Sequence, residues 1–181
     1  MVDPDRPPIP YIYFPPVPGI ELTSDDIEHG QRIPDTHHAD SSMGMDGDNV
    51  SPHLSWSGVP DGTQSLAITC FDPDAPTGSG FWHWSLFDLP ASITELPRGA
   101  GSGDQAALPT GAIHARNDAG GLGYIGMAPP EGHGDHRYVF AVHALDVETT
   151  GVDADATNAL AGFMMFGHVL ARGIITGTFS R

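Results

Sequence analysis

Three segments of the chain carry the clearest strand patterns. Residues 65 to 71 read SLAITCF, residues 82 to 89 read WHWSLFDL, and residues 136 to 147 read HRYVFAVHALDV. All three are rich in residues that suit a pleated surface, and Pro, Gly or Asp bound them. Because the first segment is apolar on both faces, it is predicted to be a central, buried strand.

The C-terminal region changes to a helical period. Between residues 153 and 173, apolar residues at 156, 160, 163, 164, 170 and 171 follow acidic residues and end near Arg172, which predicts an amphipathic helix. Gly162 and Gly167 weaken the helix prediction, because glycine disfavours helix interiors. Residues 174 to 181 then predict a last strand. The FMMF stretch within this helix is expected to pack in the core, and a homodimer through the same soft apolar surface is the alternative.

The first 20 residues form a different kind of segment. Prolines at positions 4, 7, 8, 10, 15, 16 and 18 surround Tyr11, Tyr13 and Phe14, which predicts an extended, polyproline-like arm docked on its own domain. A PxxP ligand for another protein is the less favoured alternative. Residues 21 to 181 are then one domain, since 181 residues are most simply a single core.

Charge and cysteine content exclude several classes of function. The formal net charge is −16, and the seven basic residues are all Arg and are not clustered, so nucleic-acid binding is not expected. Cys70 is the single cysteine, which excludes an intrachain disulfide. With no leader pattern and no membrane-length apolar run, a cytoplasmic protein without integral membrane association is expected.

One histidine pair near the N-terminal third raises the question of a metal. His37 and His38 lie beside Asp40 in a polar, turn-rich region. Adjacent imidazoles seldom aim at one point, so these residues are predicted to be solvated loop residues, and no metal site is assigned. His114, His133, His143 and His168 are given no role in ligand binding, and the apolar neighbours of His143 place it in the core or at an interface.

The stretch DPDAPTGSGFWHW, residues 72 to 84, carries the candidate chemistry. Pro73 restricts Asp72 to extended geometry, and in an extended chain Asp72 and Asp74 are expected on the same side. Pro76 closes the stretch, and its bond to Ala75 is a candidate for the cis isomer.

Strand alternation then groups the side chains around these carboxylates. In the strand after the turn, Phe81 and His83 are expected on one face, and Trp82 and Trp84 on the other. The two Trp side chains are therefore expected to pack together behind the imidazole.

The segment GHGDHRYVF shows the same alternation. His136 and Tyr138 share a face, whereas Arg137 points to the opposite side. If the three strand ends converge, Asp72, His83, His136 and Tyr138 meet.

Four motifs now support a family resemblance. NVSPHLSW, DPDAPTGSGFWHW, GHGDHRYVF and GHVLARGIITGTF stand in the order and spacing of the phosphatidylethanolamine-binding protein family, in the bacterial branch often called Raf-kinase-inhibitor-like. The similarity runs from about Asn49 to the C-terminus. It implies a mainly β fold of two antiparallel sheets with Greek-key connections, and short peripheral helices including one near the C-terminus.

The resemblance also implies a small pocket for phosphate-bearing or other anionic ligands. The implied ligand-binding residues are Asp72, Phe81, His83, Ala128, Pro130, His136 and Tyr138. At two of these positions, Phe81 and Ala128, the chain departs from the common pattern of the family. The departures are Phe81, where many eukaryotic members have Trp, and GYIGMAPP, which replaces the usual pocket loop around Ala128. Phe179 similarly stands where Tyr is common.

Each group has an expected role. The two imidazoles, the Tyr138 hydroxyl and backbone N–H groups of residues 128 to 131 are the expected donors to the anion. Asp72 is expected to accept a hydrogen bond from one imidazole and so favour its charged form, and anion affinity should rise from about pH 7.5 to 5.5. Asp74, Pro76 and Arg137 are structural, with Asp74 and Arg137 forming a partly buried ion pair.

The sequence therefore predicts a non-enzymatic binding protein for a small anionic or zwitterionic ligand, such as a phospholipid head group, that modulates a protein kinase or protease as some relatives do. No catalytic residue, cofactor or metal is assigned. The alternatives are a metal- or His/Asp-dependent hydrolase that uses the same pocket, and a protein-interaction module that acts through its surface.

Overall fold

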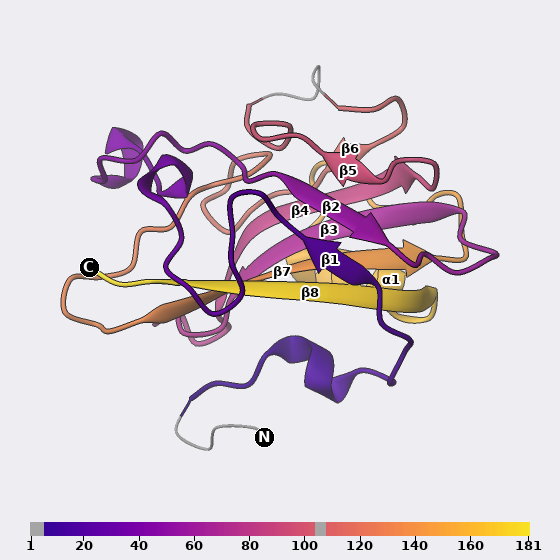
Figure 1. The fold of residues 1–181 in the computed structure, drawn as a ribbon, viewed down its shortest axis with the longest axis horizontal. Helices are drawn as coiled ribbons and strands as arrows, with labels where there is room; N and C mark the ends of the chain where they lie inside the picture. Colours follow the sequence, from indigo (N-terminus) through magenta and orange to yellow (C-terminus); the bar gives the residue numbers. More distant parts are fainter. Residues whose placement is uncertain (1–5, 104–107) are drawn as a thin grey trace.

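The computed structural model describes residues 6–103 and 108–181, so the first five residues of the predicted arm lie outside it (Figure 1). Within this part of the chain the strands form two antiparallel sheets, as predicted. The larger sheet has the order β6-β4-β3-β7-β8 and the smaller one the order β1-β2-β5. The strands are β1 (Glu21–Thr23), β2 (Leu54–Ser57), β3 (Ser65–Asp72), β4 (Phe81–Pro90), β5 (Glu95–Leu96), β6 (Ile113–His114), β7 (His136–Leu145) and β8 (Val169–Phe179).

The predicted central strand is confirmed. β3 is buried at every position and pairs with β4 on one side and β7 on the other. Because β7 lies beside β3 rather than beside β4, the connection from β4 to β7 passes over β3, as expected for a Greek-key sheet. The three-stranded sheet covers one face of the larger sheet, and the main core between them includes Leu54, Trp84, Tyr138 and Phe140.

The helices are short and peripheral. They are α1 (Asn158–Phe166) and three 3₁₀ helices, η1 (Pro10–Tyr13), η2 (Asp35–His37) and η3 (Ser41–Met43). No helix among the described residues is both long and apolar enough to cross a membrane.

The C-terminal helix is shorter than predicted. Thr157 caps its start by accepting a hydrogen bond from the Leu160 amide, and the helix ends before Gly167. Residues 169–173 belong instead to β8, because they pair with the C-terminal half of β7 apart from an irregularity at Leu170, and this pairing outweighs the local helical period. The inward residues also differ from the prediction, since Ala161 and Met165 are buried whereas Phe163 is 76% exposed.

A bulge in β4 overturns the predicted pairing of the two tryptophans. Cys70 is opposite Trp84 and Phe71 is opposite Trp82, so one extra β4 residue, His83, lies between these pairs. An inserted residue breaks strict alternation. Trp84 therefore faces the main core, whereas Trp82 packs on Phe71 with ring centroids 4.5 Å apart, and the two tryptophans do not pack together.

Residues 6–19 lie along β7 as a docked segment. Tyr11 is buried on Val139 and Ala141, and its hydroxyl shares a 2.6 Å hydrogen bond with Oγ1 of Thr69. The 3₁₀ turn at Pro10–Tyr13 interrupts the otherwise extended path. At the far end of this segment, Phe14 contacts Phe166 of α1 edge-on at 5.5 Å.

The prediction that His37 and His38 are solvated is wrong. Both side chains are buried, and each bonds to a backbone carbonyl: Nδ1 of His37 to Val50 at 2.7 Å, and Nε2 of His38 to Ile33 at 3.0 Å. Asp40 instead caps η3 through the Ser42 amide. These histidines therefore fasten the long segment between β1 and β2.

Candidate ligand-binding site

A cavity of about 200 Å³ opens where the ends of β3, β4 and β7 meet. All seven residues predicted to bind a ligand line it: Asp72, Phe81, His83, Ala128, Pro130, His136 and Tyr138. Pro76 also lines it. The structure thus brings the predicted groups together, and ligand binding by them stays a prediction.

Strand ends position these side chains. Asp72 is the last residue of β3 and His136 is the first residue of β7, the neighbouring strand. On β4, the bulge places His83 on the cavity side with Phe81, and their rings lie 4.8 Å apart. The cavity is therefore fixed by the pairing of three strands rather than by loops alone.

A chain of hydrogen bonds links Asp72 to a surface histidine. Nδ1–H of His136 donates to Oδ2 of Asp72 at 2.7 Å, which is the carboxylate–imidazole bond expected from the sequence. Nε2 of His136 lies 2.8 Å from Nδ1 of His133, an exposed residue without a predicted role. Both nitrogens of His136 are thus engaged within the protein.

His83 presents a different arrangement. Its Nδ1 lies 2.8 Å from the carbonyl oxygen of Ile125, so Nδ1 carries the proton and Nε2 is left to meet a ligand. Burial lowers the pKa of this imidazole, although the Ile125 carbonyl and the Asp72 carboxylate oppose that shift. His83 is therefore mostly neutral at pH 7.

The hydroxyl of Tyr138 is the group in the cavity wall whose hydrogen bonding points most directly to a ligand. It is buried and has no hydrogen-bond partner among the described residues. Burial, followed by the nearby Asp72 carboxylate, raises the pKa of this phenol, so it stays protonated and can donate. A buried polar atom without a partner is costly and calls for an explanation, of which a missing ligand is one.

Two residues that the sequence analysis missed hold the cavity loop. The Gly126 amide donates to Oδ1 of Asn49 at 2.7 Å, and Asn49 adopts a left-handed φ of 56°. A Cβ on Gly126 would lie 2.3 Å from the Ala39 backbone nitrogen, so only glycine permits this close approach. The glycine run near residue 123 and the NVSPHLSW motif were the available signals.

The predicted set of backbone donors in this loop is too large. Pro129 and Pro130 have no N–H, so residues 128 to 131 offer amide hydrogens only at Ala128 and Glu131. An anion in the cavity must therefore depend mainly on side-chain donors.

Asp74 and Arg137 form the predicted ion pair. Nε and Nη2 of Arg137 contact Oδ2 and Oδ1 of Asp74, each at 2.8 Å, and Arg6 of the N-terminal segment adds a contact to Oδ2 at 2.9 Å. Burial opposes ionisation, but the Arg137 hydrogen bonds and the charges of Arg137 and Arg6 together lower the pKa of the Asp74 carboxyl.

Two predictions about this turn are wrong. Asp74 does not share a side with Asp72: residue 74 lies in a turn, where its amide donates to Oδ1 of Asp72 at 2.8 Å while its carboxylate meets Arg137. The backbone leaves the extended form because this local hydrogen bond closes the turn. The Ala75–Pro76 bond is trans, as are the other peptide bonds of the described residues.

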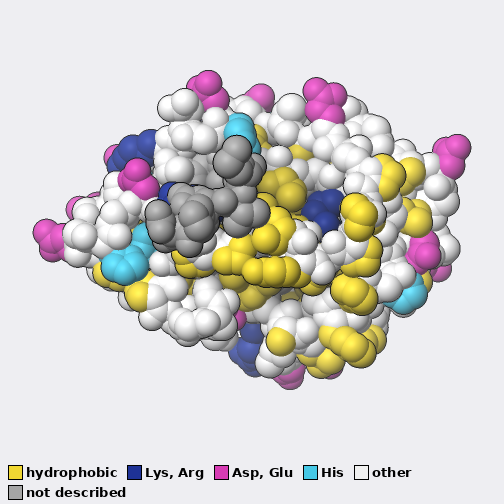
Figure 2. Space-filling view, turned by 90° about the horizontal axis from the view of Figure 1, so that it is seen from below, with side chains coloured by type: hydrophobic (Ala, Val, Ile, Leu, Met, Phe, Trp, Pro, Cys, Tyr) yellow, Lys and Arg dark blue, Asp and Glu magenta, His cyan; other side chains and the backbone are white. Residues whose placement is uncertain are grey.

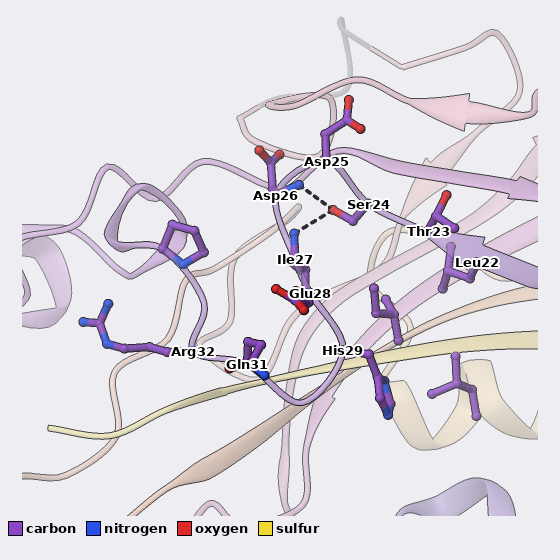
Figure 3. Close-up of a pocket in the computed structure, with 13 residues that line it drawn as sticks. Leu22, Thr23, Ser24, Asp25, Asp26, Ile27, Glu28, His29, Gln31 and Arg32 are labelled. Carbon is purple, nitrogen blue, oxygen red and sulfur yellow. Dashed lines mark hydrogen bonds between the residues drawn. The ribbon is translucent and has the colours of Figure 1, made fainter.

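A larger hollow of about 640 Å³ lies elsewhere, between the loop after β1 and strand β8 (Figure 3). Its polar groups serve the loop itself: Ser24 Oγ accepts from the amides of Asp26 and Ile27 at 3.0 Å, and Asp26 binds Arg98. The hollow is open and its polar groups do not converge, so the smaller cavity is the better candidate site.

Among the described residues, no group of three or more His, Cys, Asp or Glu side chains is arranged to hold a metal ion. In particular, Asp72 and His133 occupy the nitrogens of His136 that a metal would need.

Comparison with known proteins decides the family. The family model for phosphatidylethanolamine-binding protein matches residues 23–180. The chain belongs to the phosphatidylethanolamine-binding protein family. Protein YbhB of Escherichia coli is 50% identical over 161 residues, which cover 89% of this chain and 100% of that relative.

Solved structures agree with this family assignment. The crystal structure of E. coli YbcL has a TM-score of 0.86 and 44% identity, covering 90% of this chain and 98% of its own. A phosphatidylethanolamine-binding protein homologue from Chlamydia trachomatis has a TM-score of 0.75 and 29% identity, with the same coverage. The phosphatidylethanolamine-binding protein fold thus accounts for the sheet order that assembles the cavity.

Proposed function

We propose that the cavity binds a small phosphate-bearing or other anionic group, such as a phospholipid head group, and that the protein does not convert it chemically. The observation that carries the proposal is the buried, unpartnered hydroxyl of Tyr138 beside His83 in the cavity wall. A phosphate oxygen is an acceptor that would satisfy this donor.

The arrangement of charge suits a zwitterion. The net charge of −16 repels anions at long range, so the local donors must outweigh it. Glu131 and Asp135 are exposed in the loop between two cavity residues, Pro130 and His136, and offer an ammonium group nearby partners. Phosphoethanolamine therefore fits the site better than phosphate alone.

Calorimetric titration with phosphate and with phosphoethanolamine, on wild type and Tyr138→Phe, tests the proposal. The variant removes only the unpartnered hydroxyl, so its free energy of unfolding should stay the same or increase while its affinity falls about ten-fold. Tyr13→Phe, which alters a 73% exposed residue, is the matched control. No saturable binding to wild type, or equal binding by Tyr138→Phe, would contradict the proposal.

The hydrolase alternative has one supporting observation, the 2.7 Å contact between Asp72 and His136, which resembles a general-base pair. However, the residues described in the cavity lining include no Ser or Cys, and Cys70 is buried in the core. We expect no turnover of p-nitrophenyl phosphate above a His136→Ala control. Turnover that the substitution abolishes would favour the hydrolase.

A second candidate function is self-association through an apolar surface. The exposed side chains of Leu160, Phe163 and Phe166 on α1 continue toward Ile12 and Tyr13 of the N-terminal segment. Figure 2 shows hydrophobic side chains gathered on this face, with acidic ones mainly at its rim. Light scattering of wild type and Phe163→Ser tests the homodimer, since the substitution should shift it to monomer. Modulation of a kinase or protease stays a prediction.

A further inference from the structure

His136 lies in the cavity wall, and its second nitrogen, Nε2, contacts a residue outside the cavity lining. The ring lines the cavity and is buried, whereas His133, which contacts Nε2, is exposed and is not part of the lining. An anion that enters the cavity therefore meets a ring whose donor position is already taken from outside.

The proton positions along this chain follow from the acceptors. The Asp72 carboxylate can only accept, so Nδ1 of His136 carries a hydrogen. Nε2 of neutral His136 is then an acceptor, and Nδ1–H of His133 donates to it across 2.8 Å. To bind an anion through Nε2, His136 must present an N–H there to the ligand in place of its contact with His133.

The His133 side chain makes few contacts with the rest of the described protein. Its ring contacts His136 edge-on, with centroids 5.1 Å apart, and the ring hydrogen bond to His136 is the one side-chain bond found for it in the described part of the chain. Gly132 and Gly134 flank His133 with φ values of 74° and 88°. A Cβ added at either glycine would meet no atom within 4 Å beyond its chain neighbours, so both glycines face open space. The His133 side chain can therefore leave without disturbing β7.

We propose that His133 is a removable cap on the second binding nitrogen of His136. In the ligand-free protein it occupies Nε2, and it yields that nitrogen when an anion binds. The cap makes His133 a positioning residue that sets the affinity of the cavity, and the inference rests on the proposed function of the same site.

Removing the cap should tighten binding. Anion binding to wild type must break one protein hydrogen bond, so His133→Ala is expected to bind phosphate and phosphoethanolamine about three- to ten-fold more tightly. His133→Asn places an amide N–H close to the former Nδ1–H and should return the affinity toward that of wild type.

The matched control is His168→Ala. His168 is also a surface histidine with one 2.8 Å side-chain bond, to Asp146, and it lies beyond the other end of β7. The four proteins are titrated calorimetrically with each probe, and thermal unfolding checks that each is folded. In parallel, ¹⁵N spectra of the histidine rings report whether Nε2 of His136 becomes protonated when phosphate is added.

Tighter binding by His133→Ala, reversal in His133→Asn and protonation of Nε2 on phosphate addition would support the cap. Equal affinity of His133→Ala and His168→Ala, with wild type binding normally, would overturn the cap and leave the proposed function intact. Weaker binding by His133→Ala would overturn it too, because His133 would then be a ligand itself. No binding to wild type at all would overturn the proposed function, and the cap with it.

Discussion

Nδ1 of His136 donates to Oδ2 of Asp72 across 2.7 Å, and this bond joins the first residue of β7 to the last residue of β3. Oδ1 of the same carboxylate accepts the Asp74 amide and so closes the turn that leads to β4. Both side chains are almost fully buried. One carboxylate thus holds a cavity histidine in place and links the end of β3 to the start of β7.

The Asp72→Ala variant should therefore be less stable. The substitution leaves the His136 Nδ1–H and the Asp74 amide without their buried acceptor, at an expected cost of about 3 kcal/mol in the free energy of unfolding. Asp72→Asn keeps an acceptor oxygen and should lose less than half as much. Urea unfolding at pH 7 measures both, and an Ala variant as stable as wild type would show that the bond contributes nothing.

The pH dependence of anion binding should extend to lower pH than an ordinary histidine would give. Burial lowers the folded-state pKa of His83 from 6.5, so this imidazole gains its proton only when the pH falls further. Because the anion favours the protonated form, affinity should increase as the pH decreases and should still be rising below pH 6.5.

Calorimetry in buffers of different ionisation enthalpy checks this, since binding should take up protons. The His83→Gln variant should lose most of that uptake below pH 6.5. A wild-type affinity that is flat between pH 7.5 and 5 would contradict the role of His83.

The grouping of Asp72, His83, His136 and Tyr138 could be predicted because strand alternation depends on local sequence, whereas Ala128 and Pro130 followed from the family resemblance alone. His136 and Tyr138 are two residues apart in an unbroken strand, so their common face follows directly. The same rule failed for Trp82 and Trp84, because a bulge at His83 depends on how β4 pairs with β3. Pairing between distant segments is not visible in one strand's pattern.

The other failures have a similar cause. The helix predicted from the sequence is too long because residues 169–173 follow a helical period but pair with β7. The sequence does not reveal the contact of His133 with His136, because it depends on a glycine-flanked turn whose shape the sequence does not determine. Asn49 likewise lies 77 residues from the Gly126 amide that it binds.

Acid should destabilise the protein through His143. This imidazole is fully buried, and burial and the nearby Arg172 charge lower its pKa to about 3. In the unfolded chain it binds a proton below about pH 6.5, so the stability of the neutral, folded form is lost as the pH falls from 6.5 toward 3. At pH 5 the loss should be about 2 kcal/mol.

The measurement is urea unfolding of wild type and His143→Gln at pH 7 and pH 5. Although Gln lowers stability at both pH values, it does not titrate, so the loss between pH 7 and pH 5 should be about 2 kcal/mol smaller than in wild type. Identical pH slopes would rule out this buried imidazole as the source of the acid sensitivity.

Asp74 and Arg6 form an ion pair that joins the cavity turn to the N-terminal segment, and replacing Asp74 should reduce stability more than replacing Arg6. Asp74 is 8% exposed and accepts from both Arg137 and Arg6, whereas the Arg6 side chain is 34% exposed. Asp74→Ala leaves the part-buried Arg137 without its carboxylate and should cost about 3 kcal/mol. Arg6→Ala removes only one exposed partner and should cost less than about 1 kcal/mol.

Thermal unfolding of both single variants and of the double variant separates these effects. Once Asp74 is Ala, the Arg6 substitution should have a smaller further effect on stability, because Arg6 then keeps only its exposed contact with the Asp135 carbonyl oxygen. The carboxyl pKa is lowered in the folded state, so the contribution of Asp74 is present above its unfolded pKa of about 4 and is lost as the pH falls below it. Equal losses for Arg6→Ala and Asp74→Ala at pH 7 would mean that the N-terminal segment, rather than Arg137, is the main partner of this carboxylate.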